Sequence, residues 1–478
     1  MAKYGKIALL LILTVAAAAS ALFASRTEVK EPAVAGAFYP AGREELTRAV
    51  DGYLANVPSQ PASGRLIALI APHAGYVYSG QVAAYSYRRL GERAVDTVVL
   101  IGASHTSSYA GAAVYAEGAL RTPLGTVKVN EKIARSLLSE QAGVTFARGP
   151  FEKEHSLEVQ LPFLQRTLKE VTVVPILMGA PTQASISHLA DRLTAVMRKN
   201  ERVIIVASTD LSHYHDATTA VGKDRKIVDA VARMSVEDLQ GLLASNEGEA
   251  CGGYPVLLTM MVSRNLGATN GVLYKYANSG DVSGDKGRVV GYAAMGLYKS
   301  PLSDQQKQEL LSLARKTVVD HVKNKRTPEP DVKDNRLLAN GATFVTINRN
   351  HQLRGCIGNI QPVVPLYRSV ISNAVAASSR DPRFPPMTPG ELADMEVEVT
   401  VLSPMEPIDD ARQIKVGTHG VYLEKSGRSA VFLPQVPVEQ GWDLPTYLEQ
   451  LCYKAGLPKD AWKDKDARLQ VFTADIVK

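Results

Sequence analysis

The sequence predicts an α/β domain over residues 29–300, followed by a smaller α+β domain over residues 301–478. In the first stretch, apolar runs that are typical of buried strands alternate with helix-like segments, the pattern of a mostly parallel sheet with flanking helices. In the second stretch, short strand-like runs follow one another without that alternation. At 478 residues the chain also exceeds the size at which a single hydrophobic core stops growing.

The strands of the first domain are expected in the runs LIALIAPH, DTVVLIGASH, VTVVPILMG, RVIIVASTD and GRVVGYAAMGLY. Helices are expected over residues 44–55 and 186–199, between these runs. The second domain begins with a predicted helix from Gln305 to about Val322, with Ser303 as its N-cap. A charged, proline-bearing loop or linker follows over residues 323–335.

Three of the predicted strands end directly in polar segments. His73 follows LIALI, His105 follows TVVLI, and Asp210 and His213 follow RVIIVA. Open α/β sheets bind ligands at the carboxyl edge of their strands, so these segments predict an active site. A further segment, ACGGYP, adds the thiol of Cys251. Any one of these residues alone is more often structural, and the prediction depends on their joint occurrence.

Two neutral imidazoles and one anionic ligand would hold a metal ion and leave positions open for a small molecule or dioxygen. Ser104, Ser208 and Asp210 could orient an imidazole or a bound water molecule. His213 is expected to act as a general base, because the pKa of histidine lies near neutrality.

The segment EHSLE allows two interpretations. Glu154 and Glu158 are spaced i, i+4, so on a helix both carboxylates would share one face, and His155 would point elsewhere. In one interpretation, the two glutamates are solvated residues on the surface of a helix. The other keeps Glu154 and His155, with Ser104, as candidates for the pocket.

The first domain resembles the Memo family. The resemblance is carried by EPAVAGAFYP, APHAGYVYSG, LIGASH, EHSLEVQLPFL, STDLSHY and ACGGYP, which occur in this order. It implies the fold of class III extradiol dioxygenases, non-haem iron enzymes with two histidines and a carboxylate. By position, the metal ligands would be His73, His105 and Cys251, with the thiol in place of the carboxylate, and His213 with Asp210 would be catalytic.

This substitution puts ring-cleaving activity in doubt, because a soft thiolate favours copper or thiolate-bound iron. The resemblance therefore implies a metal-binding redox protein that uses iron or copper. Memo-type proteins also bind phosphotyrosine peptides, which leaves open a non-catalytic module that holds a peptide or small molecule in the same cleft.

The second domain resembles the AMMECR family through LRGCIG, SRDPRFPPM, MEVEVTVLSPMEPI and GVYLEKSGRSAVFLPQV. Within LRGCIG, Gly355 and Gly358 permit close backbone approach or positive φ, and Cys356 is either a packed strand residue or a reactive thiol. Arg354 could bind an anion together with Arg380 and Arg383, although solvated arginines are the simpler interpretation. Cys452 is expected in the core of a helix over residues 447–455.

Memo-like and AMMECR-like domains in one chain resemble the AmmeMemoRadiSam system, which implies a radical SAM partner. The cysteine triad of such a partner's cluster is absent from this sequence, so the partner would be a separate chain.

Residues 1–24 have the layout of an export signal or membrane anchor, with Lys3 and Lys6 before an apolar, alanine-rich run. We expect an exported protein that meets the membrane only through this segment. A net charge of +6 without a dense basic patch argues against nucleic-acid binding. The three cysteines are too few for a disulfide scaffold.

Overall fold

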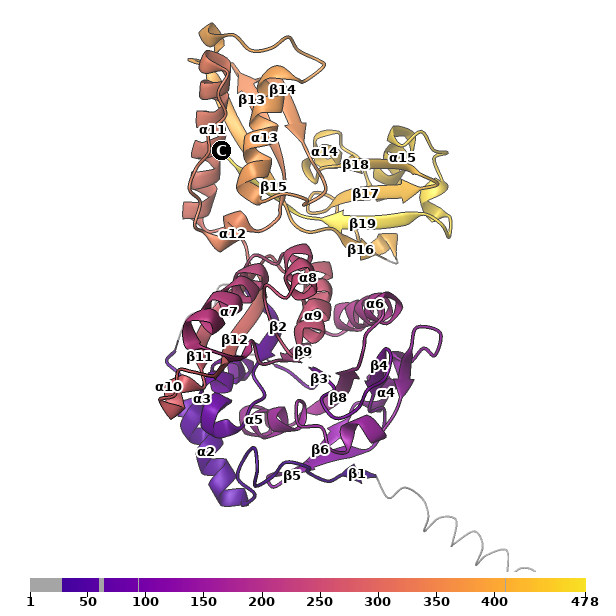
Figure 1. Ribbon diagram of the computed structural model, residues 1–478. Helices are drawn as coiled ribbons and strands as arrows, with labels where there is room; N and C mark the ends of the chain where they lie inside the picture. The colour runs from indigo at the N-terminus through magenta and orange to yellow at the C-terminus, as the bar shows by residue number, and fades with distance from the viewer. Residues whose placement is uncertain (1–27, 60–63, 93, 409) are drawn as a thin grey trace, which may run out of the picture.

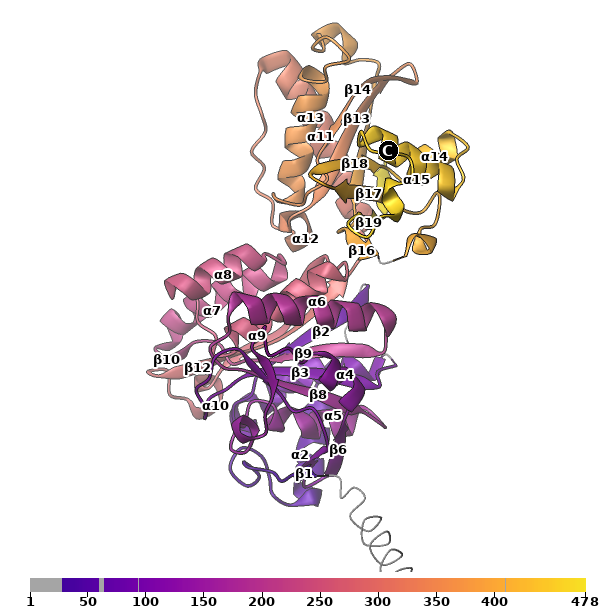
Figure 2. The ribbon, with the colours of Figure 1, turned by 90° about the vertical axis from the view of Figure 1, so that its right-hand side faces the viewer.

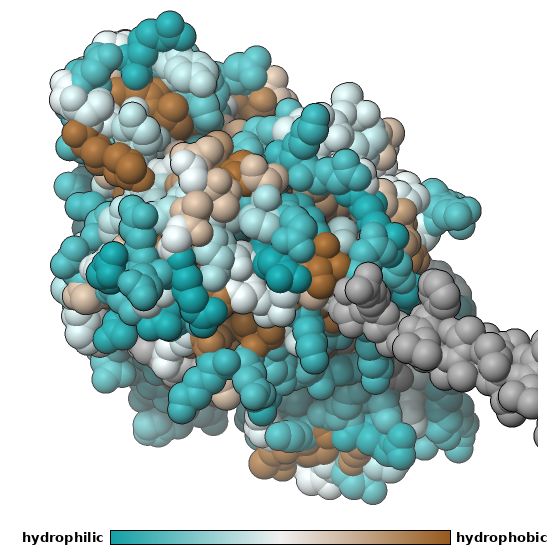
Figure 3. All heavy atoms as spheres, turned by 90° about the horizontal axis from the view of Figure 1, so that it is seen from below, coloured by the Kyte–Doolittle hydropathy of each residue, from teal (hydrophilic) through white to brown (hydrophobic). Residues whose placement is uncertain are grey.

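The computed structural model describes residues 28–59, 64–92, 94–408 and 410–478. The expected export segment, residues 1–24, lies outside these residues. Within the described ranges, no helix combines the length and the apolar character needed to cross a membrane. Figure 3 views the molecule from the side of the first domain, where most of the surface is hydrophilic and the hydrophobic residues form small separate patches.

The first domain is built on a large mixed sheet whose centre has the order β8-β3-β9-β2-β12 (Figure 1). The strands β8 (Thr172–Met178), β3 (Thr97–Ala103), β9 (Val203–Ser208) and β2 (Arg65–Ala71) are parallel. They are buried along nearly their whole length, as expected of strands covered on both faces. The strand β12 (Val289–Lys299) pairs with β2 antiparallel. The predicted α/β sheet is therefore confirmed.

Helices cover the sheet on both sides (Figures 1 and 2). The helix α3 (Tyr76–Tyr87) packs on β2, β11 and β12, and α9 (Gly253–Asn265) packs on β2, β3 and β9. The predicted helices are observed as α2 (Arg43–Ala55) and α6 (Gln183–Lys199), the latter with a capping box at Thr182.

Shorter elements complete the domain. They are β1 (Val29–Lys30), β4 (Ala112–Val114), β5 (Ala119–Thr122), β6 (Gly125–Val129), β7 (Val144–Phe146), β10 (His213–His215), β11 (Asn270–Asn278), α4 (Glu131–Ser136), α5 (Leu161–Thr167), α7 (Ala217–Ala232), α8 (Val236–Ser245) and α10 (Gly280–Ser283).

The segment EHSLE is not a helix, and the prediction that Glu154 and Glu158 share a helix face is wrong. Glu158 begins a single 3₁₀ turn, and Glu154 lies before it in irregular backbone. Neither side chain is solvated, because each residue is 2% exposed. Glu158 accepts hydrogen bonds from Lys30 Nζ, Tyr39 Oη and two backbone N–H groups of the segment between them, so it fastens the N-terminal segment to the domain.

The second domain contains two separate four-stranded sheets (Figure 1). The first has the order β14-β13-β15-β20 and packs against the helices α11 and α13. The second has the order β16-β19-β17-β18 and packs against α15. Each sheet has its own cluster of buried apolar side chains, which confirms an α+β organisation.

The bounds of the elements in this domain are α11 (Asp304–Asn324), α12 (Asn335–Leu338), β13 (Ala342–Arg349), β14 (Gln352–Gly358), α13 (Leu366–Ser379), β15 (Met395–Leu402), β16 (Glu406–Ile408), β17 (Gly420–Lys425), β18 (Arg428–Phe432), α14 (Gln435–Glu439), α15 (Leu444–Lys454), β19 (Arg468–Phe472) and β20 (Ala474–Val477). Ser303 caps α11 with a capping box, as predicted.

Candidate metal centre

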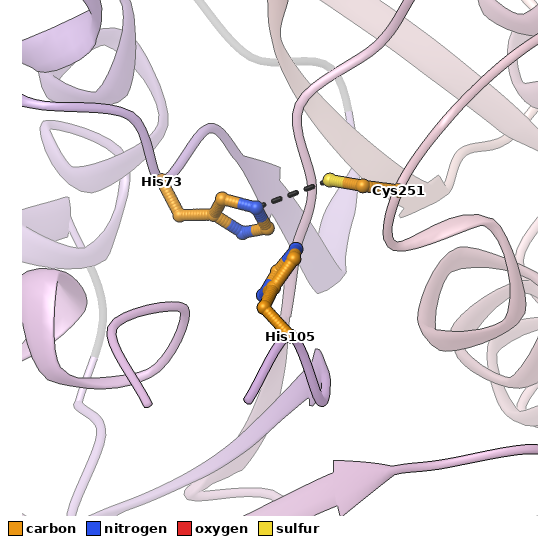
Figure 4. A group of neighbouring side chains, drawn as sticks. All are labelled: His73, His105 and Cys251. Carbon is orange, nitrogen blue, oxygen red and sulfur yellow. Dashed lines mark hydrogen bonds between the residues drawn. The ribbon is translucent and has the colours of Figure 1, made fainter. Parts of the chain in front are cut away.

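Three potential ligands meet at the carboxyl edge of the large sheet (Figure 4). His73 lies two residues beyond β2, His105 lies two residues beyond β3, and Cys251 lies in the turn before α9. One ligand atom of each residue lies within 4.8 Å of the others, and His73 Nε2 is 3.1 Å from Cys251 Sγ. The structure thus brings together three residues that are far apart in the sequence.

A chain of hydrogen bonds determines which nitrogen of His73 faces the centre. Ser208 Oγ donates to the carbonyl of Ser156 at 2.6 Å and accepts from Gln160 Nε2 at 2.8 Å. Its one hydrogen is therefore committed, so His73 Nδ1, at 3.0 Å, must be the donor in their contact. This leaves the Nε2 lone pair directed towards Cys251. Gln160 is held in turn by donation to the Pro72 carbonyl.

Glu154 determines the orientation of His105 in the same way. Its carboxylate lies 2.9 Å from His105 Nδ1 and accepts the backbone N–H groups of His105, His155 and Ser156. Burial by itself raises the pKa of Glu154, but the hydrogen bonds from His105 and from the backbone of Ser156 outweigh it and lower the value to about 2. An ionised carboxylate only accepts, so His105 Nδ1 carries the hydrogen, and in the neutral ring Nε2 keeps its lone pair.

His155 also belongs to this cluster, so the expectation that it points elsewhere is wrong. Its ring centroid lies 5.3 Å from that of His73 and 4.6 Å from that of His105. With His105 and Glu154 it forms a second group of potential ligand atoms within 4.8 Å of one another. Burial lowers the pKa of His155, which favours the neutral imidazole.

Asp210 connects two of the ligands through the backbone. Its carboxylate accepts the His73 N–H at 2.8 Å, and its own N–H points at Cys251 Sγ at 3.3 Å. Burial raises the pKa of Asp210 to about 7, against the opposing effect of the hydrogen bonds from His73 and Ala74. Burial and the neighbouring Asp210 raise the pKa of the Cys251 thiol to about 12. A bound cation would reverse this and favour the thiolate.

His213 lies beside the ligand group rather than in it. Its Nδ1 is 2.8 Å from the Leu211 carbonyl, which can only accept, so Nδ1 carries the hydrogen, and in the neutral ring Nε2 has the lone pair. His213 is near enough to His73 to contribute to the lowering of its pKa, after burial and the other two histidines. The hydroxyl of Ser104 donates to the Ser107 carbonyl.

Sequence reasoning missed Gln160, although it named Ser208. Gln160 is 1% exposed and sits in the otherwise apolar run VQLPFL. A buried amide inside such a run requires hydrogen-bond partners, and this was the available signal.

The glycines of LRGCIG serve close packing. A Cβ atom on Gly355 would lie 2.2 Å from the Ala377 carbonyl oxygen of α13, and one on Gly358 would lie 2.2 Å from the Phe344 ring. Neither glycine has a positive φ, so of the two predicted reasons only close approach applies. Arg354 pairs with Glu391 at 2.7 Å and also donates to the Pro385 carbonyl.

Cys356 lies on the edge strand β14, where two residues take the place of a neighbouring strand. Asp381 accepts the Cys356 N–H at 2.8 Å, and Arg383 Nη2 donates to the Cys356 carbonyl at 3.2 Å. Asp381 and Arg383 pair with each other at 2.7 Å. The thiol is half-buried and accepts from Thr346 Oγ1. Arg354 and Arg383, two of the three arginines predicted to bind an anion, are thus engaged in ion pairs. The third, Arg380, is exposed.

Cys452 is buried in the core of the second sheet.

The comparisons with known proteins agree with this architecture. The sequence model of the Memo-like proteins matches residues 30–296, and that of AMMECR1 matches residues 311–477. A MEMO1 family protein of Methanothermobacter thermautotrophicus is 35% identical over 275 residues, which are 55% of this chain and 99% of the relative. A MEMO1 family protein of Thermotoga maritima is 38% identical over 286 residues, which are 56% and 99% of the two chains.

Among solved structures, an uncharacterized protein from Pyrococcus horikoshii aligns with 37% of this chain and 92% of its own, at 40% identity and a TM-score of 0.35. The family match covers more than half of the chain, and the relatives are matched over nearly their whole length. The chain therefore belongs to the Memo family and carries an AMMECR1 domain after its Memo domain.

Proposed function

We propose that this chain is a metal-dependent redox protein whose Memo domain holds iron or copper through His73, His105 and Cys251. The donor set fits either metal, because imidazole binds both ions and a thiolate favours copper or thiolate-ligated iron. When bound, the metal would supply the redox chemistry. The His105 side chain is 29% exposed, so the centre is accessible to a small molecule.

The observation that carries this proposal is the orientation of the two imidazoles. Buried acceptors hold Nδ1–H of both rings, Ser208 for His73 and Glu154 for His105. Both Nε2 lone pairs therefore remain available, in a group whose third member is a thiol. Such outer hydrogen-bond partners are typical of metal-ligating histidines. We assign proton transfer to His213 Nε2, with Asp210 as the buried group that positions the His73 backbone.

Metal analysis tests the proposal. The purified protein is loaded with iron(II) or copper and desalted, and its metal content is compared among the parent chain, Cys251→Ser, His105→Ala and the matched thiol control Cys356→Ser. We expect both site variants to lose most of the metal and the control to keep it. Equal metal content in all four proteins would contradict the proposal.

A second candidate function is a non-catalytic module that holds a peptide or small molecule. It is favoured by exposed apolar and aromatic side chains on the segments that carry the site residues, namely Val77 and Tyr78 after His73, Tyr214 after His213, and Tyr254 after Cys251. Oxygen uptake with catechol-type substrates separates the two functions. Metal-loaded protein that consumes no oxygen and still binds such a compound would support the binding module.

We also propose that residues 1–24 direct export and that any radical SAM partner is a separate chain. The charged flank and apolar run support export. A reporter that folds only outside the cytoplasm, fused after Lys478, should be active. If only a cytoplasmic reporter works, the segment is no export signal, and association with a radical SAM protein becomes the better proposal.

A further inference from the structure

A hollow lies between the two domains, lined by residues of both. Its cavity volume is about 40 Å³, enough for a small anion. Its walls come from the ends of α7 and α9 in the Memo domain and from α12 and β15 in the AMMECR1 domain. Cavities at domain junctions are common places for ligands.

Of the described residues that line this hollow, the charged ones are Arg233, Arg264 and Arg336, and none of the lining residues carries a carboxylate. Arg233 pairs with Asp238 at 3.2 Å and Arg264 pairs with Glu237 at 2.9 Å. Both pairs are partly exposed, so water and salt weaken them.

Arg336 differs from the other two arginines. Among the described residues its guanidinium has no ion pair and no hydrogen-bond partner, and its Nε is a buried atom. The nearby Asp334 caps α12 and receives Gln306, so it is already engaged. Asp475 attracts Arg336 without pairing with it. Burial lowers the pKa of Arg336 to about 10, yet it remains cationic at neutral pH.

The Nε atom of this guanidinium is buried without a hydrogen-bond partner, and the side chain as a whole is only partly exposed, so a bound anion would supply the missing acceptor. The planar fork of the guanidinium matches the oxygens of a carboxylate or phosphate. The side-chain amide of Asn340, which also lines the hollow, makes no hydrogen bond to any residue that the structure describes and can donate to the same ligand. The apolar side chains of Met234, Met405 and Ile360 surround these polar groups.

We infer that the hollow is a binding site for a small organic oxyanion, with a carboxylate or phosphate group held by Arg336. The ligand touches both domains and fixes their relative position, since Arg336 belongs to one and the paired arginines belong to the other. The inference is independent of the proposed metal centre and uses none of its residues.

Calorimetric titrations with sodium phosphate and with sodium succinate, at constant ionic strength and without added metal, test this site. They compare the full chain with Arg336→Met and with the control Arg315→Met, which removes an exposed arginine on α11. We expect one of the two anions to bind the parent chain and the control alike. Arg336→Met should bind it about tenfold more weakly, the factor expected for one charged hydrogen bond.

Asn340→Asp is a second variant, which adds negative charge to the lining with almost no change in shape. It should also weaken binding of the anion, and it decides the matter if Arg336→Met does not fold. The anion that binds, phosphate or succinate, shows whether the site recognises a phosphate or a carboxylate group. Failure of both anions to bind the parent chain, or equal affinity in the parent chain and the folded variants, would overturn the inference.

Discussion

At the scale of single residues, the candidate centre is defined as much by hydroxyl and carboxylate groups as by its ligands. Ser208 and Glu154 accept the Nδ1–H groups of the two histidines, and both acceptors are buried. Buried acceptors of this kind select one imidazole tautomer and restrict rotation of the ring. The proposed metal affinity of the site should therefore depend on residues that would not contact the metal.

Ser208→Ala tests this dependence. Without the hydroxyl, His73 has no acceptor for Nδ1–H, so metal affinity should fall by about 10-fold to 100-fold. The matched control is Ser86→Ala, which removes another buried hydroxyl that donates to the Ile70 carbonyl. Ser86→Ala should lose about 1 kcal/mol of stability, and Ser208→Ala should lose more, because its hydroxyl makes three hydrogen bonds rather than one. Equal metal affinity in the two variants, measured by competition with a chelator, would argue against a positioning role for Ser208.

Asp210 should make the stability of the metal-free protein depend on pH. Burial raises its pKa to about 7 in the folded state, well above the usual 3.8 of an aspartate. The folded state therefore binds the extra proton between these values, and the resulting stability is present below pH 4 and lost as the pH rises through 7. Asp210→Asn keeps an acceptor for the His73 N–H but cannot ionise.

We expect Asp210→Asn to be more stable than the parent chain at pH 8. Its stability should not show the decline between pH 4 and 7 that Asp210 causes. Chemical denaturation between pH 4 and 8 in the presence of a chelator measures it. Asp191→Asn, at an exposed position of α6, serves as the control. A parallel pH dependence in the parent chain and Asp210→Asn would contradict the assignment.

The proximity of His73 and His105 could be predicted because each histidine follows a long apolar strand, and the parallel order of β2, β9 and β3 brings the strand ends together. The residues that surround the two histidines could not be predicted. Gln160 and Ser156 hold Ser208, the acceptor of His73, from a segment whose irregular path depends on tertiary contacts. The same segment gave the wrong interpretation of Glu154, because an i, i+4 spacing also occurs by chance in non-helical backbone.

At the scale of elements, the packing of β14 against α13 allows no side chain at Gly355. Gly355→Ala would place a Cβ atom 2.2 Å from the Ala377 carbonyl oxygen, so strand and helix must separate. We expect a loss of about 1 to 3 kcal/mol in the unfolding of the second domain. Gly390→Ala is the control, since its Cβ would meet nothing within 4 Å. Equal denaturation midpoints for the two variants would show that the strand shifts at no cost.

The elements themselves differ in how far the sequence predicts them. Long apolar strands such as β3 and capped helices such as α11 follow directly from local pattern and capping residues. The division of the second domain into two sheets does not, because β15 and β16 are separated by only a few residues and pair with different partners. Pairing over long sequence distances decides that division.

At the scale of the whole molecule, α11 packs in the core of the second domain, although the exposed segment 325–334 separates it in sequence from the rest of that domain. Leu310, Ala314 and Val318 of this helix are buried in the same core as residues of α13 and β15. Cleavage in that segment by limited trypsin treatment should therefore leave the two fragments associated. They should co-elute in size-exclusion chromatography and separate only in denaturant. Separate elution without denaturant would show that α11 does not hold the second domain.

The ion pair between Asp381 and Arg383 should also limit self-association of the protein. Together they satisfy the outward N–H and carbonyl of Cys356, the groups through which a foreign strand would dock. Asp381→Ala would free both groups and release Arg383, and β14 would then become a template for intermolecular pairing. We expect this variant to form oligomers whose size grows with concentration in light scattering, whereas Asp410→Ala, at another Asp–Arg pair, should stay unchanged. The ion pair thus contributes to the solubility of the protein as well as to its fold.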